Sequence, residues 1–263
     1  MASPVPSAVG TERVVLHGVD FSGADSGGAA KIRMVSRDLD APKAALRLDG
    51  RFDRGALVRR ILAMREDGRR HLVRIDAPVG LPLDTLRSFE VTPDWSVMAA
   101  WVAGFGSPRL WRGEVRTVDR REPKRVCDTA FRTPMAPMNL RVFKQTWTLI
   151  AEVLRPLAEA GVRVEPVHAA GGSVTVCEGC PASVLRLKGW PDHGYKGAGD
   201  PPRRVRADIL KRLQGRERLV LAAEMVRTAE EDPEGDLLDA ILLVTDPLQW
   251  VAPAEARVEG WVY

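Results

Sequence analysis

Short apolar segments of this chain repeatedly lead into an acidic residue. One segment ends at Asp20, a second is followed directly by Asp76, and a third by Glu178. Apolar runs of about four to eight residues, rich in valine and isoleucine, are typical of buried strands. Because strands of one sheet can end at a common edge, carboxylates that lie far apart in the sequence can meet there. The chain therefore predicts a sheet with acidic side chains at the ends of its strands.

Helical periodicity between these segments predicts an α/β fold. A hairpin is expected between residues 13–20 and 29–35, through the glycine-rich turn at 22–28. Asp53 is expected to cap a helix that Gly68 ends. The resulting order predicts a mixed sheet with flanking helices. The other predicted strands are residues 44–48, 71–75, 162–167 and 174–177, and the other predicted helices are 147–160, 200–213, 218–228 and 236–244.

The chain is expected to form one domain over residues 13–263, after a short disordered tail at 1–12. An insertion, mostly irregular or helical, is predicted at about 83–146, where the periodicity is weaker and prolines are frequent. Its tryptophans, Trp95 among them, are more typical of a core than of a surface that stacks on bases. We expect this insertion to cover the site.

Composition favours a cytoplasmic protein without a membrane partner. No apolar run reaches the roughly 18 residues that span a bilayer, and the first residues lack the pattern of a secretory signal. Three cysteines are too few for a disulfide framework in 263 residues. Cys177 and Cys180 form a single CxxC, which would need ligands such as His168, His193 or Cys127 to hold zinc.

Charge is distributed unevenly along the chain. Residues 105–145 and 186–218 each hold ten Lys/Arg and four Asp/Glu, whereas residues 221–263 hold two and ten. Basic clusters attract polyanions, so nucleic acid or a nucleotide is the expected partner. The alternative is a solvated, arginine-rich surface.

The acidic residues predict a divalent metal site. Asp236 and Asp239 lie three positions apart on a helix that is apolar nearly all round, so they share a face. Carboxylates are rarely buried unless paired or metal-bound, and their oxygens suit Mg²⁺ or Mn²⁺. Two such ions about 4 Å apart can activate water for phosphodiester hydrolysis. The predicted catalytic residues are Asp20, Asp76, Glu178 and Asp239, and the predicted metal ligands are Asp20, Glu178, Asp236 and Asp239.

Each acidic residue also has a structural interpretation. Asp20 and Asp76 could complete turns, and Asp236 could cap its helix. Glu178 could pair with a nearby arginine. The glycine-rich turn that begins at Ser22 could cradle phosphate through its backbone amides, or it could be a plain hairpin loop. Lys196 and Arg203 are placed to meet phosphates, or to lie on a solvated surface.

Seven short segments carry a resemblance to a known family: residues 18–24, 75–82, 125–132, 178–183, 195–197, 236–240 and 259–263. In this order they resemble the family called domain of unknown function 429. Its members are described as predicted nucleases with a ribonuclease H-like fold, so the resemblance implies that fold and activity here. It also implies roles in substrate binding for Arg125 and Arg132. One departure is Glu178-Gly179-Cys180-Pro181, where the family usually has Glu-Val-Tyr-Pro.

These observations predict a metal-dependent nuclease, a phosphodiester hydrolase that uses Mg²⁺ or Mn²⁺. A first alternative is a binding protein of the same fold that holds nucleic acid without cleaving it. A second is a nucleotide-dependent phosphotransferase or ATPase, although that architecture needs two core domains around the nucleotide, and this chain offers one set of strands.

Overall fold

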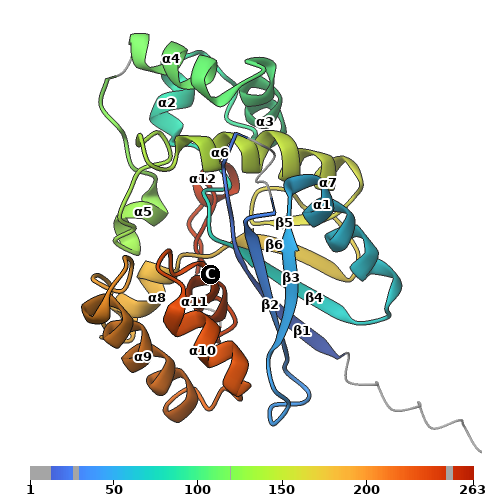
Figure 1. The fold of residues 1–263 in the computed structure, drawn as a ribbon. Coiled ribbons are helices and arrows are strands. Elements are labelled where there is room, and N and C mark those ends of the chain that lie inside the picture. Colours follow the sequence, from blue (N-terminus) through green and yellow to red (C-terminus); the bar gives the residue numbers. More distant parts are fainter. Residues whose placement is uncertain (1–12, 26–29, 119, 247–250) are drawn as a thin grey trace, which may run out of the picture.

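A computed structural model describes residues 13–263 except 26–29, 119 and 247–250. The described residues form a six-stranded sheet with the order β3-β2-β1-β4-β6-β5 (Figure 1). β1, β2 and β3 are antiparallel neighbours, whereas β4, β6 and β5 continue the sheet parallel to β1. The predicted tail at 1–12 lies outside the described residues. The strands are β1 Val14–Asp20, β2 Ile32–Asp38, β3 Arg47–Phe52, β4 Arg70–Ile75, β5 Arg163–Glu165 and β6 Val174–Glu178.

Helices cover both faces of this sheet, which confirms the expected α/β fold. On one face α1, α3, α6 and α7 share a core with Val19 and Ile75; on the other, α8 to α11 pack on Leu16 and Val35 (Figure 1). In the described part of the chain, no helix has both the length and the apolar character that crossing a bilayer requires. The helices are α1 Arg54–Ala63, α2 Leu83–Ser88, α3 Trp95–Gly104, α4 Pro108–Val118, α5 Val126–Ala130, α6 Phe143–Leu149, α7 Arg155–Glu159, α8 Pro181–Leu187, α9 Asp200–Gly215, α10 Ala223–Glu231, α11 Asp236–Leu242 and α12 Ala256–Glu259.

The hairpin of β1 and β2 was predicted correctly, but β2 and β3 each lie about three residues later than expected. Ile32, the first residue of β2, pairs with Phe52, the last residue of β3, and both are large apolar residues. Asp53 caps α1 as predicted, because its Oδ1 accepts a hydrogen bond from the Ala56 amide at 2.6 Å.

The long predicted helix at 147–160 begins earlier and is interrupted. α6 starts at Phe143, a π-helical stretch covers Ile150–Leu154, and α7 follows. Pro156 has no amide hydrogen to donate to the preceding turn, and a wider turn relieves that mismatch. The combined helix crosses the sheet on the same side as α1.

The segment predicted as an insertion at about 83–146 contains α2 to α5 and the start of α6. Trp95 and Trp111 are buried in the core on the α6 side of the sheet, as the core interpretation predicts. The Trp95 indole donates to the Val79 carbonyl at 2.8 Å, which ties the segment to the loop after β4. Helices α2, α3 and α4 of this segment lie above the sheet in the view of Figure 1.

Candidate metal centre

The parallel register of β1 and β4 brings Asp20 and Asp76 together. Val19 lies opposite Ile75, and the Asp76 amide donates to the Val19 carbonyl at 2.9 Å. The next residues along, Asp20 and Asp76, are therefore also side by side. Because successive side chains of a strand point to opposite faces, both carboxylates lie on the face that α11 covers.

Helix α11 adds Asp239 to this pair. A Cβ atom on Gly18 would lie 2.1 Å from the Ala240 carbonyl oxygen, so only glycine lets the helix approach β1 this closely. Oxygen atoms of Asp20, Asp76 and Asp239 lie within 4.8 Å of one another. We call these three residues the aspartate cluster. Asp236 is one helical turn away and half-buried, near the cluster but not within this group.

The three carboxylates differ in their partners. Asp239 accepts hydrogen bonds from the Tyr195 hydroxyl at 2.9 Å and from the Lys196 ammonium at 2.7 Å. Asp20 is 9% exposed, and no described residue donates a hydrogen bond to its carboxylate or pairs with it. A buried carboxylate without a donor is costly unless a cation compensates it.

Burial and mutual repulsion raise the pKa values of the whole aspartate cluster. Burial, followed by the charge of Asp239, raises the pKa of Asp76 to about 8 and that of Asp20 well above its usual range. Burial also raises the pKa of Asp239, against the opposing effect of Lys196. A divalent cation would remove this repulsion and keep all three ionised at neutral pH.

Glu178 does not join the aspartate cluster, and its predicted place beside Asp20 and Asp239 needs correction. On β6 it lies opposite Ile75 rather than Asp76. This offset of one residue turns its side chain to the other face of the sheet. There its two oxygens accept hydrogen bonds from the Arg125 guanidinium at 2.7 and 2.6 Å, which is the alternative that the sequence left open.

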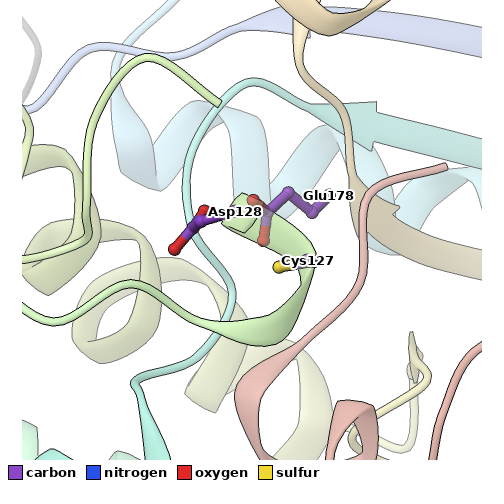
Figure 2. Close-up of side chains that lie close together, drawn as sticks. All are labelled: Cys127, Asp128 and Glu178. Atoms are coloured by element: carbon purple, nitrogen blue, oxygen red, sulfur yellow. The ribbon is translucent and has the colours of Figure 1, made fainter. Parts of the chain in front are cut away.

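Glu178 lies instead in a second group with Cys127 and Asp128 of α5 (Figure 2). Arg125 donates to both carboxylates of this group, and it is almost fully buried. Burial raises the pKa of the Cys127 thiol, so that residue stays protonated. Since the group already contains its own cation and a neutral thiol, the aspartate cluster is the better candidate for a metal ion.

A cavity of about 1080 Å³ joins the two groups. Ser22, Lys196 and Arg125 line it, as their predicted contact with substrate requires, although both carboxylates of the second group already engage Arg125. Arg132 and Arg203 do not line this cavity, and both are exposed, so the structure does not support their predicted contact with substrate there. Arg203 is on α9, turned toward solvent.

The sequence did not reveal other basic residues of the cavity or the role of Tyr195 as a donor to Asp239. Arg33 lies directly opposite Asp20 in the β1–β2 pairing, so a correct hairpin register would have found it. The others come from loops and strands whose spacing carries no such signal. The additional basic residues that line the cavity are Lys31, Arg33, Arg51, Arg141 and Arg186.

The CxxC of Cys177 and Cys180 has no metal ligands around it in the part of the chain that the structure describes, because neither residue belongs to a group of metal-binding side chains. All three cysteines are buried free thiols.

Comparisons with protein-family models, with curated proteins and with solved structures found no match to this chain.

Proposed function

We propose that this protein is a metal-dependent phosphodiester hydrolase that binds Mg²⁺ or Mn²⁺ at the aspartate cluster and acts on nucleic acid. The observation that carries the proposal is the convergence of three carboxylates, one of them nine-tenths buried without a donor among the described residues. Hard oxygen ligands in this number suit either ion. The ribonuclease H-like assignment, which the resemblance implies, is part of the same proposal.

The charges of the cavity favour a phosphate-containing substrate. Basic side chains from β2, β3 and the segment before α6 line it beside the aspartate cluster, Arg33 and Arg141 among them. Phosphate oxygens bind to such residues, while a metal ion offsets the carboxylates that would otherwise repel them. A divalent ion at the cluster would lower the pKa of a bound water.

In the proposed reaction, a water oxygen forms a bond to phosphorus and the ester oxygen leaves with the bonding pair. The water releases one proton to the medium, and the leaving oxygen takes one up. Asp20 and Asp76 would hold the divalent ion near the ends of β1 and β4. Ser22 and the basic residues orient the phosphate.

The test is cleavage of labelled single- and double-stranded DNA and RNA in Mn²⁺ or Mg²⁺. Asp20→Asn and Asp239→Asn should each lower cleavage by more than roughly 100-fold, because even residues that only support metal ligands are worth 10–100-fold. Asp84→Asn is the control, since this carboxylate is exposed on α2. Equal activity of the wild type and both cluster variants contradicts the proposal.

Two other outcomes separate the alternatives. Binding of nucleic acid that weakens with salt, without turnover in either metal, indicates a binding protein instead. Saturable binding of ATP would favour a phosphotransferase, but the described residues contain one core sheet, and that architecture requires two.

A further inference from the structure

The loop between α8 and α9 holds a lysine against the aspartate cluster. The Lys196 ammonium is 2.7 Å from Asp239 Oδ2, and its side chain also lines the cavity. About half of this side chain remains exposed, at 53%. The ammonium can therefore contact a bound anion without leaving Asp239.

The backbone on both sides of Lys196 is hydrogen-bonded to other parts of the chain. Buried Arg206 donates to the Tyr195 carbonyl at 2.6 Å and to the Gly197 carbonyl at 3.1 Å. The Gly197 amide in turn donates to the Pro233 carbonyl at 2.6 Å. An exposed lysine is ordinarily mobile, but one whose neighbours are anchored this way is held in position.

These contacts restrict how many metal ions the cluster can bind. Both oxygens of Asp239 already accept a hydrogen bond, one from Tyr195 and one from Lys196. Asp20, by contrast, is buried and accepts no hydrogen bond from any residue that the structure describes. One divalent ion together with one ammonium balances the three carboxylates of the cluster, whereas a second divalent ion would leave an excess of positive charge beside the Lys196 ammonium.

We propose that the aspartate cluster binds a single divalent ion and that the Lys196 ammonium takes the place of a second one. This inference rests on the proposed function and replaces the pair of ions that the sequence suggested. During hydrolysis of a phosphodiester, Lys196 opposes the negative charge that builds on the phosphate as water adds and the ester oxygen leaves. It stays protonated throughout, so the proton balance of the reaction is unchanged.

The experiment counts bound Mn²⁺ by calorimetric titration and by electron paramagnetic resonance. The Asp20→Asn/Asp76→Asn double variant gives the background of ions bound elsewhere. We expect the wild type to bind one Mn²⁺ above that background. Lys196→Met should bind two, with the spin coupling of neighbouring ions, and Lys196→Arg should bind one because it keeps the charge.

Each outcome decides between the proposals. Two ions in the wild type overturn the role of Lys196 and leave the proposed function standing. No ion above background overturns the proposed function as well. A single ion in a folded Lys196→Met variant also contradicts the inference. Circular dichroism checks that the Lys196→Met variant is folded. The number of ions bound by the wild type tests the inference independently of that variant.

Discussion

Arg125 shows how one residue can hold the second group together. Its guanidinium is 1% exposed and donates to Glu178, Asp128 and the Glu259 carbonyl. It thereby joins α5, the end of β6 and α12. Removing it would leave two almost fully buried carboxylates without their cation, which is costly.

Arg125→Ala should lower the free energy of unfolding by about 3–5 kcal/mol, the range for breaking a buried ion pair. Arg203→Ala is the matched control: it removes an exposed arginine and should change stability by less than about 0.5 kcal/mol. Urea denaturation at neutral pH measures both. A loss below about 1 kcal/mol for Arg125→Ala would mean that its carboxylates find other partners.

The sequence predicted which acidic residues lie at the ends of the strands. It did not predict the face of the sheet on which each side chain lies. Asp20, Asp76 and Glu178 all follow apolar strands, and that pattern identified them together. Their separation depends on the offset of one residue between β4 and β6. Register is set by long-range pairing, which the local pattern of a strand does not contain.

At the scale of elements, the distance between β1 and α11 determines the geometry of the aspartate cluster. Gly18 is the contact point, since its missing side chain makes room for the Ala240 carbonyl. The sequence predicted both elements and their acidic residues. It did not predict their close approach, because a glycine within a strand can also mark a β-bulge or simply make the strand less stable.

Gly18→Ala should therefore separate α11 from β1. We expect a loss of about 1–3 kcal/mol in stability, as for overpacking in a core, and weaker Mn²⁺ binding because Asp239 moves with the helix. Gly113→Ala on α4 is the control: it is exposed, a Cβ there meets nothing within 4 Å, and it should stabilise by about 0.5–1 kcal/mol. Similar stability and metal affinity in both variants would show that close packing at Gly18 does not position Asp239.

At the scale of the whole molecule, two buried networks act on stability in opposite directions with pH. His17 bridges the sheet from Ser36 on β2 to His71 on β4, at 2.7 and 2.8 Å. Burial, followed by the charge of His71, lowers the pKa of His17 to about 3. Between pH 3 and 6.5 the unfolded chain binds the extra proton, so this network adds stability as the pH rises.

The aspartate cluster has the opposite sign. Asp76 has a raised pKa of about 8, whereas in the unfolded chain it titrates near 3.8. Between these values the folded state binds the extra proton, so stability falls as the pH rises. The two effects oppose each other up to about pH 6.5, and above that pH the effect of the cluster continues while that of His17 has ended.

The metal-free protein should therefore lose stability between about pH 6.5 and 8, by up to about 1.4 kcal/mol per pH unit for one proton. Asp76→Asn should flatten this dependence, and Mn²⁺ should remove it by keeping the cluster ionised and paired. Asp84→Asn, at an exposed site, should follow the wild type. Urea denaturation at several pH values, with a chelator and then with Mn²⁺, gives the slopes. If Asp76→Asn keeps the wild-type slope, the raised pKa of Asp76 is not the cause of the pH dependence, and metal binding at the cluster loses its energetic basis.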